Sequence, residues 1–212
     1  SRSVDLQANF AAVPVERGVV ERNPKKVFDL SEAERLLLDM QSSLRSKSEP
    51  LSSSSEIILS YVESDSTLVT SEGSNVREKT SYTDLLIYLI LRQIAAGYAT
   101  YITGGQGGLE VFEAQSWDQT LDDLILRARS MLGAKLLPPL DRGRKFTVIL
   151  DTYAAGAVAH EVAHMLEGDQ AQMKYFSNLN LEEDLEIVDN PLIPGGYASF
   201  VWDDEGVRGR KK

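Results

Sequence analysis

The chain has 212 residues, with 22 Lys and Arg against 32 Asp and Glu, and a formal net charge of −10. Its hydrophobic content of 42% can fill a core, and the length suits one large domain or two small ones. An acidic chain lacks the surplus of Lys and Arg on which phosphate contacts depend, so we expect no nucleic-acid partner. The sequence contains no cysteine, which excludes disulfide bonds, a thiol nucleophile and cysteine metal ligands within it.

The sequence also shows no membrane or targeting segment. Its most apolar run, from Leu85 to Leu91, is much shorter than the roughly 20 residues that a spanning helix needs. The chain begins SRSVDLQANF, with neither an initiator methionine nor a basic and apolar signal segment, and it ends on RGRKK. We therefore expect no membrane contact, and we expect both ends to be cuts in a longer protein.

The first predicted element is a helix over residues 31–46. Ser31 followed by Glu34 forms a capping-box pattern, and a run of apolar residues comes next. The serine-rich segment 48–55 contains Pro50 and predicts a polar linker between this helix and the following elements.

From residue 56 the apolar pattern changes to that of strands. Branched and alternating residues predict a small antiparallel sheet whose strands are joined by glycine-rich loops. The expected strands cover 57–61, 66–70, 76–80, 82–93 and 98–103, and a helix is the alternative for the apolar stretch 82–93, because its periodicity does not distinguish the two. The glycine run 104–108 lacks the lysine of a phosphate-binding loop and predicts a flexible turn.

A second helix is predicted from an N-cap at Ser116 to about Leu132, with one buried face. The elements expected after it are a buried strand at 146–150, a turn at 151–156, a third helix at 157–168, and strand-like pieces at 185–188 and 196–202. The fold class is therefore α+β, with an antiparallel sheet and flanking helices. Pro138-Pro139 marks the expected domain boundary.

We expect residues 1–139 to form a partial N-terminal α+β domain. Residues 140–212 would begin a β-rich C-terminal metalloprotease domain, because a metal-binding pattern lies on the third predicted helix.

That helix carries His160-Glu161-Val162-Ala163-His164, an HExxH pattern that contains both histidines of the chain. Two histidines four residues apart on a helix are about 40° apart around its axis, so both imidazoles project from one face. They can share a tetrahedral Zn²⁺, and Glu161 can then act as general base on the zinc-bound water. The alternative, two incidental imidazoles beside an acid, is disfavoured because the pattern rarely arises from composition alone.

The pattern is incomplete, because a catalytic zinc needs three protein ligands and an open position. Glu167 lies on the same helical face, and we predict that it and Asp169 orient the ligands rather than bind the metal. Glu182, Glu183 and Asp184 stand where thermolysin-like enzymes supply a glutamate. The alternative for this acidic stretch is a solvated face.

The motif belongs to a longer run, VILDTYAAGAVAHEVAHMLEGD at 148–169, which is followed by EIVDN at 186–190 and DDEGV at 203–207. Together these segments resemble the TldD/PmbA family, also called the modulator of DNA gyrase family, and within it the archaeal TldD-like type. The resemblance is strongest over 146–208 and extends more weakly back through the predicted sheet and first helix.

The resemblance implies a cytoplasmic zinc metalloprotease that hydrolyses unfolded or extended peptides inside a dimer, formed with itself or with a family homologue. It assigns the zinc ligands to His160 and His164 and the general base to Glu161. It also implies a role near the active site for the acidic loop 203–206. Because some family members have lost their metal, a non-catalytic peptide-binding or assembly subunit is the alternative.

Two features depart from the family's pattern. The bacterial pattern has three residues between the glutamate and the second histidine, whereas only Val162 and Ala163 stand there in this chain. The family's third zinc ligand is a cysteine far downstream, and this sequence has none. We expect the chain to stop before that ligand, which leaves half a zinc site.

Overall fold

The structure is a computed structural model and describes residues 14–135, 143–166 and 188–211. These residues fall into two compact units. The first unit combines the described residues up to 134 with those from 188 onward, and the second lies between them in the sequence. The segment that ends the chain is therefore part of the same unit as the strands near its beginning.

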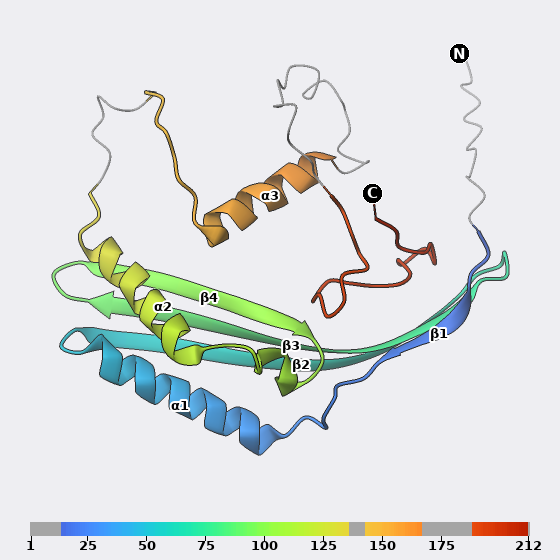
Figure 1. Ribbon diagram of the computed structural model, residues 1–212, viewed down its shortest axis with the longest axis horizontal. Coiled ribbons are helices and arrows are strands. Elements are labelled where there is room, and N and C mark those ends of the chain that lie inside the picture. Colours follow the sequence, from blue (N-terminus) through green and yellow to red (C-terminus); the bar gives the residue numbers. More distant parts are fainter. Residues whose placement is uncertain (1–13, 136–142, 167–187, 212) are drawn as a thin grey trace, which may run out of the picture. The chain divides into compact units, whose positions relative to one another are not determined.

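The first unit is organised around the long strand β3 (Asn75–Arg92). Strand β2 (Ser52–Val69) pairs with it antiparallel along its whole length. On the other side of β3, β1 (Arg17–Arg22) pairs parallel with its first part, and β4 (Ala96–Gln106) pairs antiparallel with its second part (Figure 1). One central strand thus has a single long partner on one side and two shorter partners, end to end, on the other.

One face of β3 forms the core. Side chains alternate along a strand, so every second residue points to the same face. The completely buried members of this face are Thr83, Leu85, Ile87, Leu89 and Leu91. Helices α1 (Leu30–Ser48) and α2 (Trp117–Leu132) pack against them through apolar residues three and four positions apart, together with the short 3-10 helix η1 (Leu109–Phe112).

Helix α2 approaches the beginning of β4 very closely. A Cβ atom built on Gly97 would lie 2.0 Å from the carbonyl oxygen of Ala128, so no larger residue fits there without moving the helix. This glycine therefore sets the distance between helix and sheet.

Several predictions from the sequence are confirmed. The fold is mixed α+β with a mostly antiparallel four-stranded sheet among the described residues. Ser116 is the N-cap of α2, and the helix ends at Leu132 as predicted. The buried strand expected at 82–93 is the second half of β3.

The N-terminal predictions were wrong in two places. Asp29, not Ser31, is the N-cap of α1, because its Oδ1 accepts hydrogen bonds from the backbone N–H groups of Ser31 (2.8 Å) and Glu32 (3.3 Å). The expected linker 48–55 is instead the last residue of α1, a short turn at 49–51 and the first four residues of β2. Strand β2 then runs unbroken through the predicted gap between two short strands. Every residue of β2 is paired with a residue of the continuous strand β3, and this pairing outweighs the low strand propensity of serine.

Later predictions were also wrong in part. Gly104 and Gly105 lie within β4 rather than in a flexible turn. Residues 146–150 form no strand, and residues 196–202 form turns with one isolated bridge, Trp202 to Arg208. Strand β1, which the sequence did not indicate, depends on its parallel pairing with β3.

The second unit contains α3 (Thr152–Leu166), which begins five residues before the predicted start and replaces the expected turn at 151–156. Its described side chains, from 152 to 164, are exposed apart from the half-buried Val162. Residues 185–187 lie outside the described ranges, so the strand-like piece expected there stays a prediction. Within the described parts of the chain, none of the helices has both the length and the apolarity to cross a bilayer.

Candidate metal centre

Helix α3 starts at a side-chain cap. Asp151 Oδ1 accepts a hydrogen bond from the N–H of Ala154 at 2.8 Å, and the carbonyl of Asp151 accepts one from the N–H of Ala155, also at 2.8 Å. An aspartate in this position satisfies N–H groups that have no partner within the helix and interacts favourably with the helix dipole. The cap fixes where the helix begins and hence which residues share its faces.

The two histidines come together on this helix as the sequence predicted. The Nε2 atoms of His160 and His164 are 2.9 Å apart, and the ring centroids are 4.4 Å apart with the planes almost perpendicular, at 88°. Both side chains are exposed to solvent. At this distance the N–H of one ring donates a hydrogen bond to the Nε2 lone pair of the other, so two imidazole nitrogens one helical turn apart approach the same point.

This arrangement fits a shared metal ion. Tetrahedral zinc with bonds of about 2.0–2.1 Å places two ligand nitrogens about 3.3 Å apart. The observed separation of 2.9 Å is shorter by a few tenths of an ångström, which a small rotation of exposed rings can supply. Imidazole nitrogens are also ligands that zinc prefers, and Glu161 follows His160 directly on the exposed helix.

Glu167, Asp169 and the acids at 182–184 lie outside the described residues. Among 14–135, 143–166 and 188–211, no three His, Cys, Asp or Glu side chains gather closely enough to hold a metal. The described residues therefore offer two candidate ligands, His160 and His164, with the carboxylate residue Glu161 beside them in the sequence.

The acidic loop at 203–206 has a defined conformation in the first unit. The carboxylate of Asp203 accepts hydrogen bonds from the N–H groups of Glu205 (3.0 Å) and Val207 (2.8 Å), which closes a tight turn. Gly206 has a positive φ of 79°, and a Cβ there would come within 2.8 Å of Leu68. Asp203 thus orders the backbone of the loop, and its predicted role near a catalytic centre stays a prediction.

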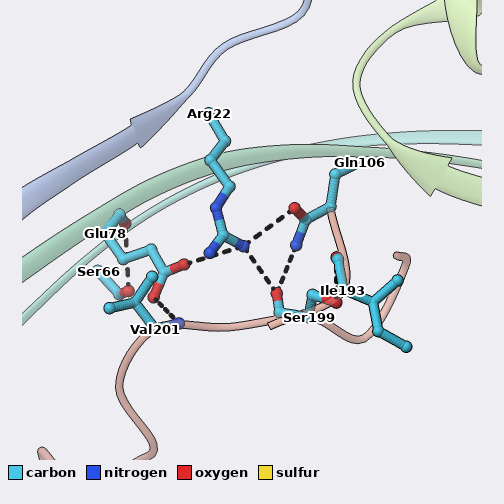
Figure 2. A network of polar contacts seen from close by, with 7 residues as sticks. All are labelled: Arg22, Ser66, Glu78, Gln106, Ile193, Ser199 and Val201. Atoms are coloured by element: carbon cyan, nitrogen blue, oxygen red, sulfur yellow. Dashed lines mark hydrogen bonds and ion pairs between the residues drawn. The ribbon is translucent and has the colours of Figure 1, made fainter. Parts of the chain in front are cut away.

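A polar network holds the segment before this loop against the sheet, as Figure 2 shows. Arg22 Nη1 donates hydrogen bonds to Gln106 Oε1 and to the carbonyl of Ser199, each at 3.0 Å, and lies 3.4 Å from Glu78 Oε1. Gln106 Nε2 also donates to the Ser199 carbonyl. The other oxygen of Glu78 accepts from the N–H of Val201 at 3.2 Å.

Sequence reasoning missed this network, because its members come from β1, β3, β4 and the end of the described chain. Arg22 and Ser199 are 177 positions apart. No local pattern marks such a contact, and a lone arginine on a short strand resembles any exposed cation.

The fold and the motif together define a class: a mixed α+β protein that carries the paired histidines of a metallopeptidase on one helix. The sequence profile of the PmbA/TldA metallopeptidase central domain matches residues 23–136, and that of the PmbA/TldA metallopeptidase C-terminal domain matches 143–212. The first match alone covers more than half of the chain. The chain belongs to the PmbA/TldD metallopeptidase family, which implies a metal ion.

One curated relative supports the same assignment. The chain is similar to Metalloprotease MJ0996 of Methanocaldococcus jannaschii, with 38% identity over 92 residues. The match covers 40% of this chain and only 20% of the relative. No solved structure matches the chain.

Proposed function

We propose that this chain carries part of the zinc site of a peptidase, and that the whole protein hydrolyses unfolded or extended peptides in the cytoplasm. The observation that carries the proposal is the 2.9 Å approach of His160 Nε2 and His164 Nε2 on α3. Membership of a metallopeptidase family supports it, because the motif lies within the part matched by the C-terminal domain profile. A third ligand has to come from outside the described residues.

Each residue of the motif has one role in this proposal. His160 and His164 hold the ion through Nε2, which leaves Nδ1 of each ring to carry the hydrogen. A bound zinc ion acts as a Lewis acid and lowers the pKa of water to about 7. The Glu161 carboxylate accepts a proton from the attacking water and donates it to the leaving amine nitrogen, while the water oxygen bonds to the carbonyl carbon and the C–N bond breaks.

The proposed substrate is supported by backbone chemistry, and the proposed assembly by the family resemblance of the sequence. An extended peptide has free N–H and C=O groups that can pair with an enzyme strand, whereas a folded domain has already used them. We therefore propose unfolded peptides as substrates and a dimer, of two identical chains or with a family homologue, as the assembly.

Zinc content tests the metal site directly. After incubation of the longest available version of the protein with equimolar zinc and desalting, we expect about one zinc per chain in the wild type and in Glu161→Gln, and almost none in His160→Ala or His164→Ala. Zinc retention in both histidine variants equal to that of the wild type overturns the proposal. Loss of zinc in Glu183→Ala and Asp184→Ala would identify the acidic stretch as the source of the third ligand.

Hydrolysis of an unfolded protein such as reduced, alkylated casein separates the catalytic role from metal binding. We expect Glu161→Gln to retain zinc and to lose the hydrolysis that the wild type shows. A chain that binds the unfolded protein but neither holds zinc nor cleaves it would instead be the non-catalytic peptide-binding subunit.

A further inference from the structure

Strand β2 has one edge that no described residue pairs with. Its partner is β3, and in the described part of the chain its other edge carries no strand. The hydrogen bond from Thr70 N–H to the Ser74 carbonyl (3.0 Å) closes the hairpin and sets which β2 residues face β3. Pairing alternates along an antiparallel ladder, so even-numbered residues bond to β3. Ser53, Ser55 and Ile57 direct their N–H and C=O groups to the open edge.

A groove runs beside the beginning of this edge. Helix α1 lies along β2 (Figure 1), and one of its faces looks onto the edge strand. The groove has a volume of about 710 Å³ and is lined by Leu38, Gln41, Ser42, Arg45, Glu49, Leu51 and Ser52–Ser55. The helical lining residues, Leu38 to Arg45, span about 10 Å at 1.5 Å per residue, the length of roughly three residues of extended peptide.

The edge lacks the usual protection against strand addition. Natural edge strands are blocked by charged side chains, by proline or by bulges. Residues 52–55 are four serines with no charge, and the register with β3 continues through them without a bulge. The backbone of this stretch is therefore accessible to another extended chain.

The charge in the groove indicates what such a chain carries. Arg45 is exposed and has no ion-pair partner among the described residues, whereas the nearby Lys47 contacts Asp118 at 2.7 Å and Asp122 at 2.6 Å. Glu49 is the acidic residue of the lining, so a peptide carboxylate has to lie at Arg45 and away from Glu49. A guanidinium group binds a carboxylate through two parallel hydrogen bonds. Leu38, which is 60% exposed, offers an apolar contact farther along the same groove.

We propose that the groove between α1 and the free edge of β2 binds an extended acidic peptide segment by strand addition. The peptide backbone pairs with Ser53 and Ser55, a peptide carboxylate contacts Arg45, and an apolar peptide side chain lies against Leu38. This site uses none of the residues of α3, so it does not depend on the proposed peptidase activity.

Fluorescence anisotropy of the full chain with a labelled peptide, Val-Glu-Val-Thr-Val-Thr, tests the proposal. Ser55→Pro removes an outward N–H without breaking a bond to β3, and we expect it to weaken binding about tenfold or more, whereas Ser55→Ala keeps the N–H and binds like the wild type. Arg45→Gln should weaken the binding of this peptide by about tenfold. It should leave unchanged the binding of a second peptide in which lysine replaces the glutamate.

A second measurement covers the case in which Ser55→Pro does not fold. The same peptide methylated on alternate backbone nitrogens has fewer donors, and we expect the wild type to bind it at least about tenfold more weakly. Equal binding of the methylated and unmethylated peptides, or of the glutamate and lysine peptides, overturns the proposal. Sedimentation equilibrium tests for a second copy of the chain as the occupant. If the wild type is a dimer and Ser55→Pro is a monomer, a second copy occupies the edge and the proposal is overturned.

Discussion

The sheet of the first unit and helix α3 of the second differ in what their side chains do. The covered face of β3 holds five completely buried residues, whereas nearly every described side chain of α3 is exposed. The sheet is held by burial and by a continuous ladder. The helix presents two imidazoles and a carboxylate to its surroundings. The residues that stabilise the first unit and the residues proposed to bind the metal therefore lie in separate parts of the chain, and substitutions should affect one without the other.

The largest effect on stability should come from the centre of the covered face. Ile87 is completely buried on β3, and Ile87→Ala removes three carbon atoms and leaves a cavity. We expect the free energy of unfolding in urea to fall by about 3–4 kcal/mol. Ile94→Ala is the matched control, because Ile94 is fully exposed in the turn after β3 and should change stability by less than about 0.5 kcal/mol. Equal effects of the two variants would contradict the assignment of the core.

The next largest effect tests the close approach of α2 to the sheet. In Gly97→Ala the new Cβ would collide with the carbonyl oxygen of Ala128, and we expect the free energy of unfolding to fall by about 2–3 kcal/mol. Gly133→Ala serves as control, since nothing lies within 4 Å of its Cβ and its φ of −99° suits alanine. Thermal unfolding of the pair measures the difference, and a Gly97→Ala protein as stable as Gly133→Ala would show that the helix packs elsewhere.

A smaller, local effect is expected where the polar network holds the segment near residue 200. Arg22→Leu removes the donor to Gln106 and Ser199, and we expect the amides of Val201 and Gly209 to exchange hydrogen faster, with protection reduced by about 1–2 kcal/mol. Arg17→Leu on the same strand changes one exposed hydrogen bond, and it should leave this exchange unchanged. Unchanged hydrogen-exchange protection of these amides in Arg22→Leu would show that the network does not hold this segment.

The smallest effect concerns an exposed pair on the β2–β3 hairpin. Hydrogen bonds from Arg77 to the Asp65 carboxylate, at 2.7 and 2.5 Å, lower the pKa of Asp65 below its ordinary value. A carboxyl group with a lowered pKa in the folded state stabilises above its unfolded pKa, and this contribution is lost as the pH falls through the folded value. Asp65→Asn should therefore unfold at slightly lower urea than the wild type at pH 7, and this difference should shrink as the pH falls below the ordinary pKa of an aspartate. If the stability difference between Asp65→Asn and the wild type instead grew as the pH fell, the lowered pKa of Asp65 would be contradicted.

The same division explains which predictions from the sequence succeeded. Helix α2 and the core strand were predictable because periodic apolar residues such as Leu121, Leu124 and Ala128 record the face that is buried. The histidine pair was predictable because a helix alone fixes the geometry of residues four apart. Both signals are local.

What the sequence did not predict depends on partners distant in the chain. Strand β1 and the serines of β2 become strands only because β3 lies beside them. Arg22 and Ser199 show no signal of their contact before folding. The apolar stretch 146–150 looks like a buried strand, yet in the structure it pairs with nothing described and its large side chains are exposed.

X-ray absorption at the zinc edge tests the central claim most directly. For the chain loaded with one equivalent of zinc, we predict a spectrum that shows two imidazole ligands on the zinc. The number of imidazole ligands should fall to one in either His160→Ala or His164→Ala and stay at two in Glu161→Gln. Ile87→Ala at a temperature where it is folded should also keep both. A wild-type spectrum without imidazole scattering, or one unchanged by both histidine substitutions, would contradict the account.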